Sequence, residues 1–365
     1  MTLRTSALRA FAAGLLAVGL VFVGAAPARA DATRRSEWYL STLKVAEAHR
    51  ITKGAGVIVA VVDQGVSTRH PDLKGAVLAG RDMVAGVDNG HLDPNGHGTS
   101  MAGLIAARGR GGSGLLGIAP EAKILPVRPS NDTTFAAEGI RWAAAHGAKV
   151  INMSFAIGGS ENLQAAVTEA AAADVVLVGA AGNTGDADNA VEYPVGYPEV
   201  LGVGAVDKKG KVAAFSQHGP QVDLVAPGVD IPTVYVTGYH TSRGTSDAAA
   251  IVSGAAALVR ARFPDLTAAE VVERLTSTAV DKGDKGRDDY YGSGQLDLLA
   301  ALTAPAPVAS ASAPVADAPV AGPAEAAGDD AGGGVPPLAI VALGIVVLAG
   351  AVLAIVFFAR RAASR

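Results

Sequence analysis

Residues 57–62 form an uninterrupted run of valine, isoleucine and alanine, which is typical of a strand buried on both faces of a parallel sheet. Around and after this run, apolar residues at helical spacing predict several helices, and strands that alternate with helices predict an α/β fold with a parallel sheet. In such sheets functional residues gather at the carboxyl ends of the strands. Further strands are predicted over residues 122–127, 149–154, 175–180, 200–206 and 222–226, and helices over residues 45–48, 98–107, 136–146 and 163–173 and from near Ser246.

The first 30 residues have the pattern of an export signal. Arg4 and Arg9 precede an apolar run, and Ala28-Arg29-Ala30 is a small-residue cleavage pattern. We therefore predict a secretory signal peptide over residues 1–30, with an uncleaved membrane anchor as the alternative. The folded domain is predicted over residues 57–302, after an N-terminal extension of residues 31–56.

The other end of the chain has the pattern of a tether and an anchor. Residues 303–337 are mostly Ala, Pro, Gly, Val and Ser, which predicts an extended linker. Residues 338–358 are apolar and long enough to cross a bilayer, although a buried helix is the alternative. The basic tail at residues 359–365 places this end in the cytoplasm. We expect a single-pass protein of the cell membrane with its domain outside the cell.

Composition excludes several classes of function. The chain has no cysteine, so it forms no disulfide and has no cysteine-ligated metal. Its net charge of -4 gives no support for nucleic-acid binding, which usually shows a concentrated basic patch.

Three residues far apart in the chain have the types that acyl transfer requires. Asp63 follows the first predicted strand, His97 precedes a predicted helix, and Ser246 lies where another helix begins. Each of them also has an interpretation without function. Asp63 could be a turn residue, His97 could be a loop residue, and Ser246 could be a helix cap. Together they supply a carboxylate, a general base and a nucleophile.

The motifs around these residues resemble those of the subtilisin-like serine proteases, or subtilases. The resemblance covers residues 57–302, and the chain shares the Asp, His, Ser order of subtilisin. The matching stretches include VVDQGV at 61–66, NGHGTSMAGLIAA at 95–107, KVINMSFAIGG at 149–159, GAAGNTG at 179–185 and GTSDAAAIVSG at 244–254. The resemblance implies a three-layer α/β/α fold and an endopeptidase in which Asp63 orients His97 and His97 activates Ser246.

The resemblance also implies the rest of the site. Asn183 matches the oxyanion-hole asparagine of the family. Polypeptide is the implied substrate, and no cofactor or metal is implied, although the acidic loop at residues 281–289 leaves calcium open. The substrate-binding residues implied are Ser154, Phe155 and Ala156 on one wall and Ala180, Ala181 and Gly182 on the other.

Within the family the chain is most similar to the mycosins, membrane-anchored proteases associated with type VII secretion in actinobacteria. The shared plan is a signal peptide, a catalytic domain, a Pro-rich linker, one membrane helix and a short basic tail. It implies a type VII secretion membrane complex as partner. It also implies that the 26 residues 31–56 wrap the domain rather than fold as a separate inhibitor. A protease-like structural partner with little catalysis is the alternative function.

Two departures from the family pattern concern the site. Gln64 stands where Thr or Ser is usual, which weakens a supporting hydrogen bond to Asp63. Asp247 stands directly after Ser246, where the family usually has Met or Phe. A charged carboxylate there would oppose an oxyanion and favour protonated His97, whereas the alternative is an acid stabilised by the helix dipole.

Overall fold

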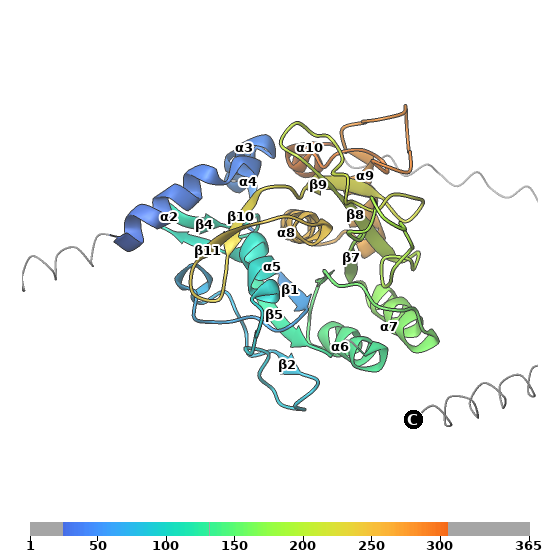
Figure 1. The fold of residues 1–365 in the computed structure, drawn as a ribbon, viewed down its shortest axis with the longest axis horizontal. Coiled ribbons are helices and arrows are strands. Elements are labelled where there is room, and N and C mark those ends of the chain that lie inside the picture. The colour runs from blue at the N-terminus through green and yellow to red at the C-terminus, as the bar shows by residue number, and fades with distance from the viewer. Residues whose placement is uncertain (1–24, 131, 306–365) are drawn as a thin grey trace, which may run out of the picture. The chain divides into compact units, whose positions relative to one another are not determined.

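A seven-stranded parallel sheet forms the centre of the fold in the computed structural model, which describes residues 25–130 and 132–305 (Figure 1). The strand order is β2-β5-β1-β6-β7-β8-β9, and every neighbouring pair is parallel. The predicted parallel sheet is thus confirmed. The strands are β1 (Ile58–Val62), β2 (Arg81–Asp82), β5 (Lys123–Arg128), β6 (Val150–Met153), β7 (Val176–Ala180), β8 (Val200–Val206) and β9 (Leu224–Pro227).

Helices cover both faces of this sheet. The helices are α2 (Ala25–Ser36), α3 (Trp38–Thr42), α4 (Val45–Ile51), α5 (His97–Ala106), α6 (Thr133–Ala145), α7 (Glu161–Ala172), α8 (Thr245–Arg262), α9 (Ala268–Ser277) and α10 (Leu298–Thr303). Two antiparallel hairpins accompany the sheet, β3 (Arg108–Arg110) with β4 (Ser113–Leu116) and β10 (Ile231–Val234) with β11 (Tyr239–Ser242).

The alternation of side chains along β1 explains the two layers of helices. Val59 and Val61 belong to the core that α5 and α8 share, whereas Ala60 and Val62 belong to the core beneath α6 and α7. Because successive side chains of a strand point to opposite faces, an entirely apolar strand requires a partner on each side. All five residues of β1 are at least partly buried, which accounts for the uninterrupted apolar run.

Helix α8 is buried along nearly its whole length. Its residues from Asp247 to Arg260 are all buried, and its small side chains allow close approach to its neighbours. A Cβ atom at Gly254, for example, would lie 2.7 Å from Cβ of Ile118. The helix therefore fixes its N-terminal residues rigidly at one edge of the sheet.

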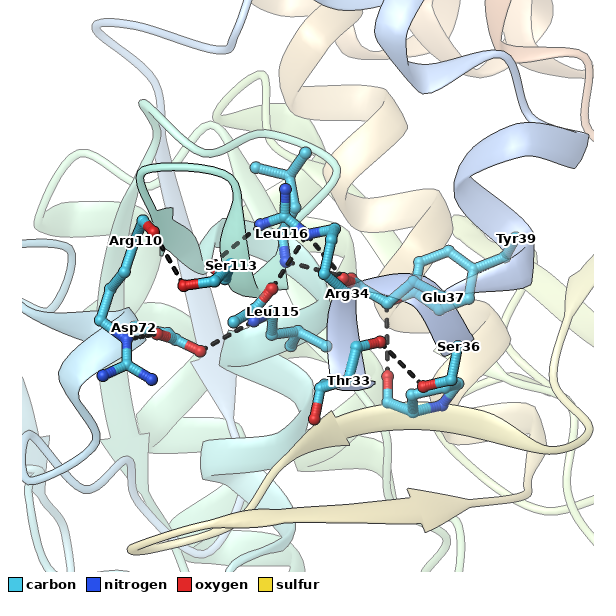
Figure 2. Close-up of polar contacts among 12 residues, drawn as sticks. Thr33, Arg34, Ser36, Glu37, Tyr39, Asp72, Arg110, Ser113, Leu115 and Leu116 are labelled. Atoms are coloured by element: carbon cyan, nitrogen blue, oxygen red, sulfur yellow. Dashed lines mark hydrogen bonds and ion pairs between the residues drawn. The ribbon is translucent and has the colours of Figure 1, made fainter. Parts of the chain in front are cut away.

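The N-terminal extension packs along the domain, as the sequence predicts. Figure 2 shows Glu37 of this extension beside the β3–β4 hairpin. Its Oε1 accepts hydrogen bonds from the Leu116 amide (3.0 Å) and the Tyr39 hydroxyl (3.0 Å), and its Oε2 pairs with Arg34 Nε (3.0 Å). Arg34 also donates to the Gly114 carbonyl at 2.9 Å. These contacts fasten residues 34–39 to the domain.

Glu37 is expected to make stability depend on pH. Burial raises the pKa of Glu37 from 4.5 to about 7, and it outweighs the opposing hydrogen bonds and Arg34. The folded state therefore binds the Glu37 proton more tightly than the unfolded state does. The resulting stabilisation of the fold is complete below pH 4.5 and is lost as pH rises through about 7. The free energy of unfolding falls by at most about 3 kcal/mol over this range. Urea unfolding of the Glu37→Gln protein should show a shallower decline between pH 4.5 and 8. An unchanged slope would contradict this account.

Most predicted elements are confirmed within a few residues, but three expectations need correction or lie outside the description. The sequence around His240 predicts a loop or the end of a helix, but His240 lies on strand β11. The expected helix at residues 45–48 extends over α4 and follows a separate α3. Four predicted segments lie wholly or mostly outside the described residues: the signal peptide except residues 25–30, most of the linker at 303–337, the membrane span at 338–358 and the tail at 359–365.

Within residues 25–130 and 132–305, no helix has the length and apolar character needed to cross a bilayer. Helix α2 runs from Ala25 to Ser36 and so includes residues on both sides of the predicted cleavage point after Ala30.

Candidate active site

The candidate catalytic residues lie where neighbouring strands end and two helices begin. Asp63 directly follows β1, Ser154 directly follows β6, and Ala180 is the last residue of β7. The three strands are adjacent in the sheet. His97 begins α5 and Ser246 is the second residue of α8. The fold thus brings residues that are distant in sequence to one edge of the sheet, as the sequence predicts.

Asp63 and His97 are in direct contact. The Nδ1 atom of His97 lies 2.9 Å from Oδ1 and 2.8 Å from Oδ2 of Asp63. The carboxylate is buried, at 5% exposure, and also accepts the Gln64 backbone N–H at 2.7 Å. The backbone therefore supplies a supporting hydrogen bond whatever side chain follows the aspartate, so Gln64 does not leave Asp63 unsupported.

The environment of His97 favours its charged form. The Asp63 carboxylate raises the pKa of His97 to about 9 against the opposing effect of burial, and the hydrogen bond to Asp63 and the charges of Asp247 and Asp93 add to the rise. With Nδ1 held by Asp63, the other ring nitrogen, Nε2, is the atom left for a substrate or nucleophile.

A buried carboxylate positions the turn that carries His97. Asp93 accepts the backbone N–H groups of Gly96 (2.8 Å) and Thr99 (2.8 Å) and the Thr99 hydroxyl (2.5 Å). These bonds occupy N–H groups at the start of α5 that have no partner within the helix. We did not single out Asp93 from the sequence; its place four residues before His97 was the available signal.

Ser246 lies beside the segment that follows β6. Its Oγ donates to the Ser154 carbonyl at 3.4 Å, and the Ser154 hydroxyl donates to the Ser246 carbonyl at 3.2 Å. Among the described residues, the hydrogen bond of Ser246 Oγ is therefore to Ser154 and not to His97. The position at the N-terminus of α8 offers free N–H groups and the positive end of the helix dipole.

Thr245 determines how Asn183 faces the site. Oδ1 of Asn183 accepts the Thr245 backbone N–H at 2.9 Å and the Thr245 hydroxyl at 3.2 Å. The amide oxygen is thus committed to Thr245, which leaves the amide NH2 of an exposed side chain as a donor next to Ser246. The Thr245 hydroxyl also accepts the Gly182 N–H at 3.1 Å, so it connects the start of α8 to the end of β7. From the sequence alone, Thr245 is an ordinary helix-capping residue before Ser246 and gives no sign of this contact.

A groove of about 420 Å³ contains the Asp63–His97 pair and the segment after β6. The predicted substrate-binding residues Ser154, Phe155 and Ala156 line it. The other lining residues were not predicted to bind substrate, and they are Gln64, Asn95, Pro129, Ser130, Ile157 and Gly158. The other predicted wall, Ala180, Ala181 and Gly182, does not line this groove and connects to the site through Thr245.

No cluster of three or more His, Cys, Asp or Glu side chains suited to a metal ion occurs among the residues that the structure describes. In the acidic loop left open for calcium, Asp281 and Asp288 accept backbone N–H groups of Gly286, Asp284, Tyr290 and Tyr291.

The parallel α/β fold and the Asp63–His97 contact are typical of a serine peptidase of the subtilase class, and comparison with known proteins agrees. The profile of the Subtilase family matches residues 54–294. The chain belongs to this family and is a serine endopeptidase. Subtilisin DY of Bacillus licheniformis is 41% identical over 258 residues, which are 68% of this chain and 92% of that protein.

Solved structures of mycosins are similar to this chain. The crystal structure of MycP1 with the N-terminal propeptide removed is 34% identical with a TM-score of 0.68, over 74% of this chain and 98% of MycP1. MycP3 protease from the type VII (ESX-3) secretion system is 36% identical with a TM-score of 0.66, over 73% of this chain and 88% of MycP3.

Proposed function

We propose that this endopeptidase acts through Asp63, His97 and Ser246, and the observation that carries the proposal is the contact of Asp63 with His97 Nδ1. Neutral His97 takes the proton of Ser246 at Nε2 while Ser246 Oγ bonds to the substrate carbonyl carbon. The resulting imidazolium is stabilised by the Asp63 carboxylate and then protonates the leaving amine as the peptide C–N bond breaks. Water attacks the acyl-enzyme in the same way and restores Ser246. The first step requires Ser246 Oγ to leave the Ser154 carbonyl and approach His97, which is a rearrangement common in substrate-free sites.

Asn183 supplies one donor for the oxyanion that forms during this attack, and the Ser246 backbone N–H supplies another. The support for Asn183 is its oxygen, held by Thr245, which directs the amide NH2 outward beside the nucleophile. Donors fixed before the reaction stabilise developing charge without having to reorganise.

Asn183→Ala is expected to lower kcat by about 10²–10³-fold with little change in KM, the loss known for the oxyanion asparagine of subtilisin. The ground-state carbonyl needs this donor less than the oxyanion does, so the loss falls on kcat. Steady-state kinetics with a peptide substrate measures it. Asn162→Ala on α7, which removes an exposed asparagine bonded to Arg141, is the matched control and should change kcat by less than about twofold. Equal losses in both variants would contradict the assignment.

The substrate is an extended polypeptide that lies along residues 154–156 in the groove. The segment follows β6 directly and lines the groove beside His97, so a bound chain would pair with its backbone as an added strand. Ala180, Ala181 and Gly182 form the opposite wall of the primary pocket in this proposal.

A fluorophosphonate probe tests the catalytic proposal. The activated serine should displace fluoride and form a stable phosphonyl ester, and peptide mass spectrometry should locate the added mass on the peptide that contains Ser246. Heat-unfolded protein is the control, since an unactivated hydroxyl does not react. A folded protein that stays unlabelled, or is labelled at another residue, would overturn the proposal and favour the alternative of a protease-like structural partner.

We further infer that the enzyme is exported and held at the cell membrane, with its domain outside and its C-terminal tail in the cytoplasm, and that it works with a type VII secretion complex. The support is the sequence pattern at residues 1–30 and 338–365 together with the mycosin neighbours, one of which is described as part of such a system. The full chain should sediment with membranes and resist carbonate extraction, whereas a chain that ends at Ala304 should be released into the medium. Release of the full chain would overturn this assignment.

A further inference from the structure

The carboxyl group of Asp247 is buried immediately beside the nucleophile. Asp247 follows Ser246 in the first turn of α8 and is 1% exposed. Its Oδ2 accepts one hydrogen bond, from the Ser242 hydroxyl at 2.8 Å, and its buried Oδ1 has no hydrogen-bond partner among the described residues. A carboxylate that is this deeply buried with one neutral donor is poorly solvated. The position therefore makes the charge of Asp247 sensitive to its neighbours.

Ionisable groups on three elements interact with Asp247 directly or through His97. His97 at the start of α5 is electrostatically coupled to it, and each favours the charged form of the other. Tyr39 of α3 is a buried phenol whose pKa is raised by burial and by Glu37, and further by Asp247. His240 of β11 bonds to Ser100, and its pKa is lowered by burial and by His97. Of these groups, His97 is the one whose positive charge Asp247 stabilises.

The balance between these effects places the ionisation of Asp247 near neutral pH. Burial raises the pKa of Asp247 to about 7, against the opposing effects of the Ser242 hydrogen bond and of His97. His97, with a pKa of about 9, is still protonated at that pH. Between these two values the ion pair of charged Asp247 and charged His97 is the favoured state. A histidine in that state cannot accept the proton of Ser246.

We propose that Asp247 is a positioning residue that helps to set the pH at which the enzyme becomes active, because its buried charge adds to that of Asp63 in holding His97 in the protonated, inactive form until the solution is alkaline. The proposal rests on the catalytic roles of His97 and Ser246 given above. Asp247 touches no reacting atom and acts through His97. The two groups titrate as a coupled pair, so the effect appears as a displaced midpoint of activity and not as a loss at all pH values.

The pH dependence of inactivation by the fluorophosphonate probe tests this proposal with purified full-length protein. Asp247→Asn keeps the size of the side chain and an oxygen for Ser242, and it removes the charge. We expect the midpoint pH of the inactivation rate to be about one unit lower for this variant than for the wild type. Well below the midpoint, inactivation should then be about tenfold faster, because tenfold more His97 is neutral.

Two further variants make the test specific. Ser242→Ala removes the hydrogen bond that favours charged Asp247, so it should move the midpoint in the same direction by a smaller amount. Asp265→Asn makes the same change of charge at an exposed residue beyond the other end of α8 and should leave the midpoint unchanged. An Asp247→Asn midpoint equal to or above that of the folded wild type would overturn the proposal, as would an equal shift in Asp265→Asn.

A measurement without turnover separates this proposal from the catalytic one. In the Ser246→Ala background, the ring resonances of His97 can be titrated by NMR, and Asp247→Asn should lower the pKa of His97 by about one unit. A labelled Ser246 with an unshifted His97 pKa would leave the catalytic proposal intact and refute the role of Asp247. An unlabelled wild type with a shifted His97 pKa would refute catalysis by Ser246 and keep the electrostatic coupling.

Discussion

Ser246→Ala is expected to lower kcat/KM for a peptide substrate by about 10⁶-fold, the size of loss known when the nucleophile of subtilisin is removed. The reason is that no other hydroxyl replaces Oγ in the attack. Binding along residues 154–156 does not depend on Oγ, so the loss should fall on kcat and leave KM nearly unchanged. Rates measured with a fluorogenic peptide, together with the thermal midpoint of each protein, provide the test.

The same prediction includes a test of whether the residues act as one unit. His97→Ala alone should cost about as much as Ser246→Ala, and the double variant should be little worse than either, because a nucleophile without its base and a base without its nucleophile are equally ineffective. Independent contributions would instead multiply. Ser277→Ala, at an exposed serine that ends α9, is the control and should retain full activity. Residual activity of a few per cent in Ser246→Ala would contradict the assignment of the nucleophile.

Six of the seven strands of the sheet could be predicted from sequence because they are buried on both faces, whereas β2, which has only the polar residues Arg81 and Asp82, could not. Each apolar run between 57 and 226 corresponds to one of the strands β1, β5, β6, β7, β8 and β9, since no water-facing position interrupts it. The hairpin β10–β11 gave no such signal. The residues of β11 are partly or fully exposed, so its sequence from Tyr239 to Ser242 reads as a polar loop, and only the pairing with β10 makes it a strand.

The principal site residues could be predicted because chain order and strand ends locate them. Asp63, His97 and Ser246 each adjoin an element that periodicity reveals, and a parallel sheet brings such positions together. The supporting contacts could not be predicted in this way. Two examples are the hydrogen bonds from Thr245 to Asn183 and those that Asp93 accepts at the start of α5. They depend on side-chain directions that only the packed fold determines.

Asp247 illustrates the same limit at the level of charge. Its place after Ser246 indicates an acid near the nucleophile, but the sequence allows two interpretations, an acid stabilised by the helix dipole and a charge that disturbs the site. The structure adds that Asp247 is 1% exposed and accepts a single hydrogen bond, from Ser242, so that its charge is poorly solvated even in the first turn of a helix. The tertiary contact of α8 with β11 therefore decides the chemistry of the residue.

Asp63→Asn is expected to lower kcat/KM by about 10⁴-fold near neutral pH, the loss known for the same change in a chymotrypsin-type triad. Asparagine can keep the hydrogen bond from the Gln64 N–H through its oxygen, so the local fold should survive. Its amide group, however, no longer accepts from His97 Nδ1–H with a full charge, and an N–H directed at Nδ1 favours the tautomer that cannot take the proton of Ser246 at Nε2.

The accompanying change in pH dependence identifies the cause of this loss. The Asp63 charge is the largest influence that raises the pKa of His97 to about 9, so its removal should move the midpoint of the residual activity to lower pH. Rates between pH 6 and 10 measure both effects. Asp297→Asn is the matched control, because asparagine replaces aspartate well at the N-cap of α10 and the change in charge is the same. A loss below tenfold, or a large loss with an unmoved midpoint, would show that Asp63 does not orient and stabilise His97 in the reaction.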